Sequence, residues 1–113
     1  MNKIKFLLNL VEHLSKRKKP VVYIAGKVTG LDEAVYTAKF AKTKAMLEAD
    51  GYQVLNPIDF VAPGSTWMQA MRISMPLLCM SDIIYMQSDW QDSPGAHLEW
   101  CTAVKFGLTV IFE

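Results

Sequence analysis

Short apolar runs alternate with segments of helical pattern along this chain, and this alternation constrains the fold more than any other feature. Four runs have the length and composition of β-strands, at residues 21–25, 52–55, 83–86 and 108–112. Three helical segments lie between them, at about residues 32–50, 67–80 and 95–106. Strands that alternate with helices form a parallel sheet covered by helices on both faces. We therefore predict a three-layer α/β fold, with a flavodoxin- or Rossmann-like parallel sheet of about four strands and an extra N-terminal helix.

Residues at the helix ends support these elements. Asp32, Thr66 and Ser93 occupy positions where a side chain can cap a helix, and Gly51 follows the first helix, where glycine commonly ends one. Within the first helix, alanines recur at steps of three or four residues. We expect this small-residue face to pack on the sheet. Its members are Ala34, Ala38, Ala41, Ala45 and Ala49.

Charge divides the chain into two parts. Its 113 residues suit one domain, and the net charge of +1 argues against a nucleic-acid partner. Residues 1–19 hold six basic residues and one acidic residue, whereas the remainder holds six basic and ten acidic residues. We predict a basic amphipathic N-terminal helix and linker at residues 1–19, followed by an α/β domain at residues 20–113. The apolar stripe of that helix would consist of Ile4, Leu7, Leu8, Val11 and Leu14.

The chain shows no sign of membrane insertion or secretion. No apolar run approaches the roughly 18 residues that a spanning helix needs. A basic run at residues 16–19 stands where a signal peptide would carry small residues for cleavage. Cys79 and Cys101 lie far apart without metal-type spacing, so we expect them to be buried free thiols in a reducing compartment. We therefore expect a cytoplasmic protein.

Ligands of open parallel sheets bind beyond the carboxyl ends of the strands. The first such loop contains Gly26, Lys27 and Gly30, and its two glycines free backbone N–H groups to approach an anion or a sugar. The loop is neither a Walker A motif nor G-x-G-x-x-G, so a plain turn is the alternative. The second loop begins with Asn56 and Pro57, which stop the preceding strand.

The third loop leads into the last helix. Ser93 can cap that helix or help to bind a phosphate or hydroxyl group, and Glu99 lies further along the same helix. A solvated glutamate is the alternative interpretation of Glu99. Three aspartates, Asp82, Asp89 and Asp92, lack the spacing of a Mg²⁺ site, so we predict no metal.

Several of these residues form a familiar combination. Tyr23 and Gly26 end the first strand, Asn56-Pro57 follows the second, and Ser93, Gly95 and Glu99 accompany the last helix. Over about residues 20–113 the chain resembles the nucleoside 2-deoxyribosyltransferase superfamily. More narrowly, it resembles a small branch of domains of unknown function within it (DUF4406-like).

The resemblance implies a glycosyl-transfer site. Glu99 would attack the anomeric carbon of a 2-deoxynucleoside, and Tyr23 would steady that glutamate. An aspartate, Asp82 or Asp89, would handle the proton of the base. Ser93 stands where relatives that hydrolyse deoxynucleoside monophosphates carry serine and those acting on free nucleosides tend to carry aspartate. The remaining predicted substrate-binding residues are Gly26, Lys27, Gly30, Asn56, Asp92 and Gly95.

We therefore expect an enzyme that cleaves or transfers the N-glycosidic bond of 2-deoxynucleosides or their 5′-monophosphates, with retention and without a cofactor. A non-catalytic nucleotide-binding or sensing module of the same fold is the first alternative. An interaction protein in which Glu99 is only a helix residue is the second. Because family sites lie near subunit contacts and the chain has many Met and Trp residues to bury, we expect a homodimer or a larger assembly.

Overall fold

Strands and helices alternate along the chain as the sequence predicts. The structure is a computed structural model, and it describes residues 2–5, 7–8 and 19–113. The strands are β1 (Val21–Ala25), β2 (Gln53–Leu55), β3 (Ile83–Met86) and β4 (Thr109–Phe112). The helices are α2 (Glu33–Ala49), α3 (Trp67–Cys79) and α4 (Pro94–Lys105), with short 3₁₀ turns η1 (Pro57–Asp59) and η2 (Trp90–Asp92) in two loops.

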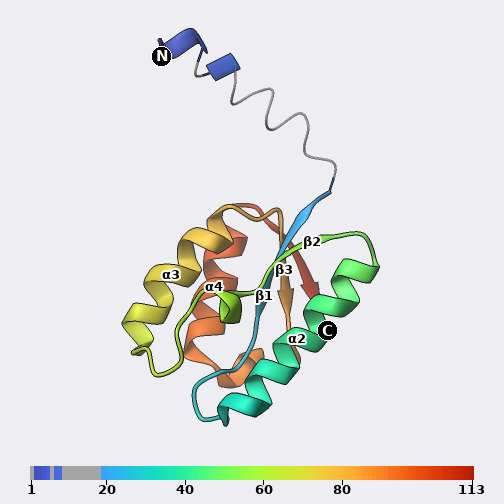
Figure 1. The fold of residues 1–113 in the computed structure, drawn as a ribbon, viewed down its shortest axis with the longest axis vertical. Helices are drawn as coiled ribbons and strands as arrows, with labels where there is room; N and C mark the ends of the chain where they lie inside the picture. Colours follow the sequence, from blue (N-terminus) through green and yellow to red (C-terminus); the bar gives the residue numbers. More distant parts are fainter. Residues whose placement is uncertain (1, 6, 9–18) are drawn as a thin grey trace.

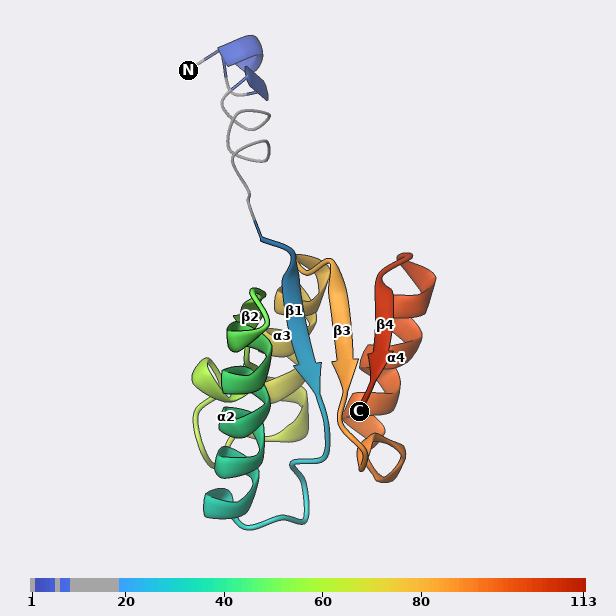
Figure 2. The ribbon, with the colours of Figure 1, turned by 90° about the vertical axis from the view of Figure 1, so that its right-hand side faces the viewer.

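The four strands form one parallel sheet in the order β2-β1-β3-β4. β1 lies between β2 and β3, and Tyr23 pairs with Leu55 on one side and Ile84 on the other. Figures 1 and 2 show α2 on one face of the sheet and α3 with α4 on the other. The predicted three-layer α/β fold is therefore confirmed.

Alternate residues of the central strands point to the two helical layers. Tyr23, Ala25, Ile84 and Met86 belong to the core on the α3–α4 side. On the other face, the core combines strand residues with two residues of α2. Its buried members are Val22, Ile24, Phe40, Leu47, Ile83 and Tyr85. Both faces of β1 and β3 are thus covered, which explains why these strands are apolar without alternation.

The face of α2 that packs on the sheet differs from the prediction. Phe40, Thr43 and Leu47 are buried, whereas all five alanines of the predicted stripe are exposed. Ala38 precedes Phe40 by two positions, and two positions on a helix point in nearly opposite directions. Burying Phe40 and Leu47 removes more apolar surface from water than burying alanines, so the larger side chains determine the orientation of the helix.

Asp32, Thr66 and Ser93 all occupy the predicted N-cap positions, but only Thr66 and Ser93 cap their helices through the side chain. Thr66 and Gln69 form a reciprocal capping box at the start of α3, and the Ser93 hydroxyl caps α4. Asp32 occupies the N-cap position of α2 without a capping hydrogen bond from its side chain. Gly51 has a φ of 93°, a left-handed conformation in which glycine avoids strain.

The predicted N-terminal helix lies only partly within the described residues. Residues 3–5 and 7–8 are helical, and Ile4, Leu7 and Leu8 are exposed there. Val11 and Leu14 lie outside the described residues. No described helix has both the length and the apolar character that crossing a bilayer requires.

Both cysteines are free, but Cys79 and Cys101 are exposed, so the expectation that they are buried is wrong.

Candidate active site

A cavity lies at the carboxyl end of β1, and residues of α2, α3 and α4 all line it. Its volume is about 150 Å³. The walls come from the loop after β1, the segment around η1, α3, and the first two turns of α4, with Tyr36 and Phe40 of α2 completing the lining. The strand arrows in Figure 2 point toward this edge of the sheet, as the rule for parallel sheets predicts.

Polar side chains meet on one wall of a cavity that is otherwise largely apolar. Tyr23, Ser74, Ser93 and Glu99 line it together with several aliphatic and aromatic residues. Glu99 is the single carboxyl group among the described lining residues, and none of those residues is Lys, Arg or His. Such a cavity suits a neutral ring system that contacts a few well-placed polar groups.

Tyr23 and Glu99 form the polar centre of the cavity. The Tyr23 hydroxyl donates a hydrogen bond to Oε2 of Glu99, across 76 positions of sequence. Tyr23 is fully buried and Glu99 is 6% exposed. Tyr23 comes from the middle of β1, where its side chain faces the α3–α4 layer, and Glu99 lies on the buried side of α4 with Ala96 and Ala103. The predicted pairing of these two residues is thus present.

Burial controls the protonation of this pair. It raises the pKa of Glu99 to about 8, while the hydrogen bond from Tyr23 acts in the opposite direction. The pKa of Tyr23 is held well above its ordinary value, first by burial and then by the neighbouring Glu99. At neutral pH the site therefore holds a protonated carboxyl group and a protonated phenol. Above about pH 8 the Glu99 carboxylate is available as a nucleophile or as a countercharge to a cation.

Ser74 completes the polar wall, and the sequence interpretation missed it. Its hydroxyl forms a hydrogen bond with the Tyr23 side chain, an interaction that lowers the pKa of Tyr23. Ser74 is 6% exposed and lies on the buried side of α3 with Leu77 and Leu78. A polar residue at helical spacing within an apolar face is a signal that could have identified it.

Ser93 and Gly95 lie at the cavity as predicted. Ser93 is buried, and its Oγ accepts a hydrogen bond of 3.1 Å from the backbone N–H of Ala96. The capping role is therefore established, and the hydroxyl hydrogen can still be donated to a ligand. A Cβ on Gly95 would lie 3.3 Å from Sδ of Met71 and from Nε1 of Trp67. Glycine at this position lets α4 approach α3 closely.

The loop after β1 contributes unequally to the cavity. Gly26, Val28 and Thr29 line it, but Lys27 and Gly30 do not. Gly26 is buried, and a Cβ there would overlap the side-chain carbonyl of Gln87. Gly30 adopts a φ of 90°, so it serves the turn between β1 and α2.

The predictions for two aspartates near the third strand need correction. Asp82 precedes β3 and accepts a hydrogen bond of 2.8 Å from the backbone N–H of Val21, at the amino end of the sheet. Because the cavity lies at the carboxyl end, Asp82 cannot deliver a proton there. Asp89 follows β3 but does not line the cavity. Burial alone would raise its pKa, but hydrogen bonds from Lys39 and from the Lys27 backbone lower it overall. Asp89 is therefore an ionised ion-pair partner rather than a proton donor.

Asn56 and Asp92 also lie outside the lining. Asn56 is buried, and its Oδ1 accepts a hydrogen bond of 3.1 Å from the backbone N–H of Ile58. It shapes the turn that presents Pro57 and Ile58 to the cavity. Asp92 is exposed in η2. Within the described part of the chain, no group of three or more His, Cys, Asp or Glu side chains could hold a metal ion.

Comparisons with known proteins give a family and a fold. The sequence model of a family described as "Domain of unknown function (DUF4406)" matches residues 20–112. A comparison with curated protein sequences found no match. Among solved structures, the chain is similar to a 2-desoxiribosyltransferase from Leishmania mexicana, with 16% sequence identity and a TM-score of 0.64. The similarity covers 82% of this chain and 63% of the other chain, which is less than two thirds of its length. At this identity the likeness shows a common fold.

Proposed function

Because the chain belongs to the DUF4406 family and has the fold of a 2-deoxyribosyltransferase, we propose that it acts on N-glycosidic bonds of 2-deoxynucleosides or their 5′-monophosphates. The observation that carries this proposal is the buried Tyr23–Glu99 hydrogen bond facing the cavity. A carboxylate held in an apolar cavity can stabilise the positive charge that develops when a glycosidic bond breaks.

The proposed reaction has two displacements at the anomeric carbon. In the first, ionised Glu99 forms a bond to that carbon, and the bond to the base nitrogen breaks with its electron pair leaving on the base. In the second, water or another base forms the new bond and displaces Glu99, so that the configuration is retained. With water as acceptor, its proton balances the one that the released base takes up. Tyr23 donates to Glu99 throughout and keeps the carboxyl oriented.

The pKa of Glu99 gives this reaction a definite pH dependence. With a pKa of about 8, little of the carboxyl group is ionised at pH 6. The nucleophile must be ionised, so kcat/KM should rise with pH and level off above about pH 8. A rate that falls over this range would argue against Glu99 as the nucleophile.

A binding module that retains the cavity without turnover is a second candidate. The observation in its favour is that no described lining residue besides Glu99 carries a carboxyl group, so the cavity lacks an evident acid for the leaving base. A protonated Glu99 can donate one hydrogen bond to a ligand and accept others. In that case Glu99 would recognise a nucleoside rather than attack it.

The two candidates are separated by base release from a panel of 2-deoxynucleosides and their 5′-monophosphates, followed by chromatography. Glu99→Ala and Glu99→Gln are compared with the wild type, and Glu48→Gln serves as a control at an exposed carboxyl of α2. Release that requires Glu99 supports the enzyme. Calorimetric binding of a nucleoside without release supports the binding module, and the preferred ligand shows whether a phosphate is recognised.

We propose in addition that the protein is cytoplasmic and forms a homodimer or larger assembly. Several large apolar side chains of the described domain are exposed, among them Phe106 at 67% and Met68 at 56%. Burying such residues between copies would remove apolar surface from water. A monomeric mass in light scattering would contradict the assembly.

A further inference from the structure

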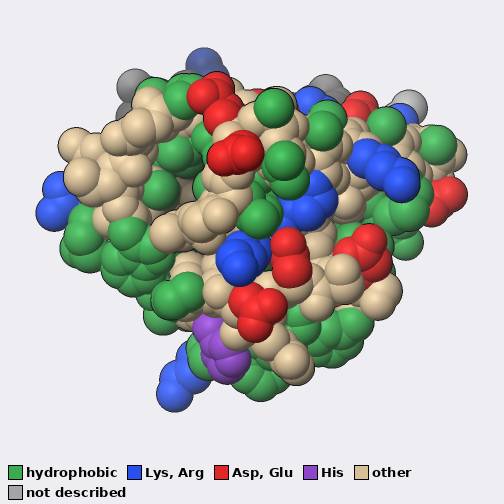
Figure 3. All heavy atoms as spheres, turned by 90° about the horizontal axis from the view of Figure 1, so that it is seen from below, with side chains coloured by type: hydrophobic (Ala, Val, Ile, Leu, Met, Phe, Trp, Pro, Cys, Tyr) green, Lys and Arg blue, Asp and Glu red, His purple; other side chains and the backbone are tan. Residues whose placement is uncertain are grey.

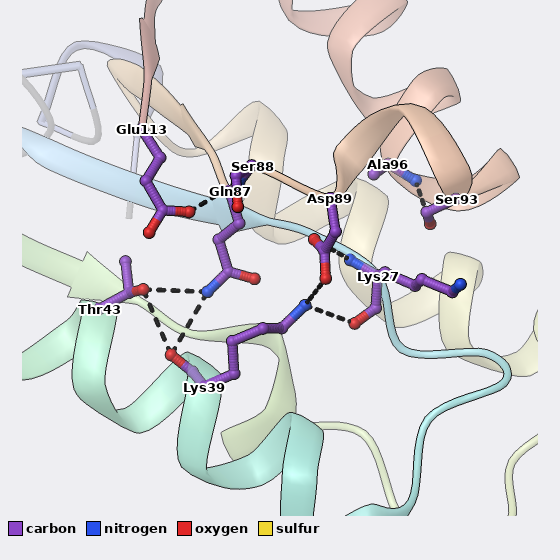
Figure 4. A network of polar contacts seen from close by, with 9 residues as sticks. All are labelled: Lys27, Lys39, Thr43, Gln87, Ser88, Asp89, Ser93, Ala96 and Glu113. Atoms are coloured by element: carbon purple, nitrogen blue, oxygen red, sulfur yellow. Dashed lines mark hydrogen bonds and ion pairs between the residues drawn. The ribbon is translucent and has the colours of Figure 1, made fainter.

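Both backbone polar groups of Lys27, in the loop after β1, are held by charged side chains. The backbone N–H of Lys27 donates to Oδ1 of Asp89 at 3.0 Å, and its carbonyl oxygen accepts from Nζ of Lys39 at 2.7 Å. Nζ of Lys39 also contacts Oδ2 of Asp89 at 2.6 Å. Figure 4 shows these three contacts closing a ring between α2, the loop after β1 and the loop after β3.

This ring is stronger than an ordinary surface ion pair. The Lys39 and Asp89 side chains are 26% and 28% exposed, compared with 36% and 45% for the Lys44–Asp59 pair. Partial burial reduces screening by water and salt, and each charged group also satisfies a backbone group. Figure 3 views the molecule from the carboxyl end of the sheet and shows basic and acidic side chains side by side near the middle of that face.

A second contact fixes the start of the same loop. Gln87 is buried, and its Nε2 donates to Oγ1 of Thr43 at 2.9 Å and to the carbonyl oxygen of Lys39 at 3.4 Å. Its side chain fills the space beside Gly26 that a Cβ would occupy. The Lys39–Thr43 turn of α2 therefore anchors the loop through Gln87 at Gly26 and through Lys39 itself at Lys27.

The residues on either side of Lys27 form part of the cavity wall. Gly26 precedes Lys27, and Val28 and Thr29 follow it, and all three line the cavity. Neither Lys39 nor Asp89 lines it. The contacts of Asp89 therefore reach the cavity through the backbone of the loop. Lys39 acts through the same backbone, and its Nζ also lies 5.1 Å from the centre of the Phe40 ring, which lines the cavity.

We propose that Lys39 and Asp89 are positioning residues, which hold the loop after β1 in the conformation that closes this wall of the cavity around a bound nucleoside. This inference rests on the proposed function for its ligand. It gives Asp89 a different role from the proton donor that the resemblance implied. Losing the ring should weaken substrate binding while leaving the Tyr23–Glu99 pair intact.

The test uses Lys39→Met and Asp89→Ala, with Lys42→Met and Asp50→Asn as controls that remove exposed charges at α2. Hydrogen exchange of the backbone amides at residues 27–31 is measured first. We expect about tenfold faster exchange there in both variants, since hydrogen bonds to charged groups are lost. In the base-release assay, the KM of both variants should rise about tenfold, while kcat should change less than threefold. The double variant should be little worse than either single one, because the three contacts act together.

The outcomes separate this inference from the proposed function. Unchanged exchange at residues 27–31, or equal effects in the two controls, would overturn the positioning role. A loss of kcat at constant KM would instead place Asp89 in the chemical step and would also overturn it. If the wild type releases no base, the proposed enzyme activity fails, but the exchange measurement still decides whether the ring holds the loop.

Discussion

Replacing Glu99 with glutamine tests the central electrostatic feature of the cavity. In the folded protein the pKa of Glu99 is about 8, compared with an ordinary 4.5, because burial disfavours the charged form. Between these two pH values the folded state holds a proton that the unfolded state has released. The free energy of unfolding must therefore fall as the pH rises from about 4.5 to about 8, and the loss is complete above that. Glutamine has nearly the same shape and never ionises, so it removes this dependence.

The magnitude follows from the displacement of the pKa. Each pH unit corresponds to about 1.4 kcal/mol, so a displacement from 4.5 to about 8 gives an upper limit of about 5 kcal/mol. Small domains have a total stability of about 5–15 kcal/mol, so even half of that limit is easily measured. Glu99→Gln should thus resemble the wild type near pH 4.5 and become increasingly more stable than it toward pH 8.

Urea unfolding at several pH values between 4.5 and 9, followed by circular dichroism, measures this effect. Glu48→Gln is the matched control, because it removes an exposed carboxyl of α2 without changing the cavity. A constant difference between Glu99→Gln and the wild type across the whole range would refute the reasoning. It would mean that Glu99 is already ionised in the folded protein and that Tyr23 compensates for its burial.

Substitutions at Tyr23, Gly26 and Ser93 test three neighbouring features. Tyr23→Phe removes the hydrogen bond that lowers the pKa of Glu99, so the Glu99 carboxyl should ionise at a higher pH than in the wild type. A ¹³C NMR titration measures this pKa, and a lower pKa in the variant would contradict the reasoning. Gly26→Ala should lower the free energy of unfolding in urea by about 1–3 kcal/mol, because the new Cβ overlaps Gln87. Adding Gln87→Ala should recover part of that loss. A Gly26→Ala variant as stable as the wild type would show that Gln87 moves aside freely. Ser93→Ala removes the cap of α4 and should lower the free energy of unfolding, measured by calorimetry, by about 1 kcal/mol. Ser93→Asp keeps a capping oxygen and should lower it less. Equal losses of stability in the two variants would rule out the cap as the cause.

Local patterns were sufficient for the elements of this fold. The runs at residues 21–25 and 83–86 are apolar throughout because both faces of the central strands are covered, and the structure has strands with these same bounds. Thr66 and Ser93 mark helix starts through capping contacts within three residues, so their effect is visible in sequence. The face of α2 was mispredicted because spacing alone cannot weigh an alanine stripe against the larger side chains beside it.

The residues of the candidate site were likewise predicted only in part from the sequence. Glu99, Tyr23, Ser93, Gly26 and Gly95 were predicted and line the cavity. The position of Asp82 before its strand already places it at the amino edge of a parallel sheet, away from the edge where ligands bind. Ser74 was missed because it meets Tyr23 only once α3 packs against the sheet.

The sequence by itself determined the order of elements, the parallel sheet and the edge at which a ligand can bind. These properties depend on periodicity, on caps and on the direction of strands, all of which act over a few residues. The resemblance had implied that Tyr23 would steady Glu99, but only the tertiary structure decided that Glu99 holds a proton at neutral pH and that Asp89 pairs with Lys39. Desolvation and ion pairing depend on every group packed around a side chain. For these residues those groups come from segments up to 76 positions apart in the sequence.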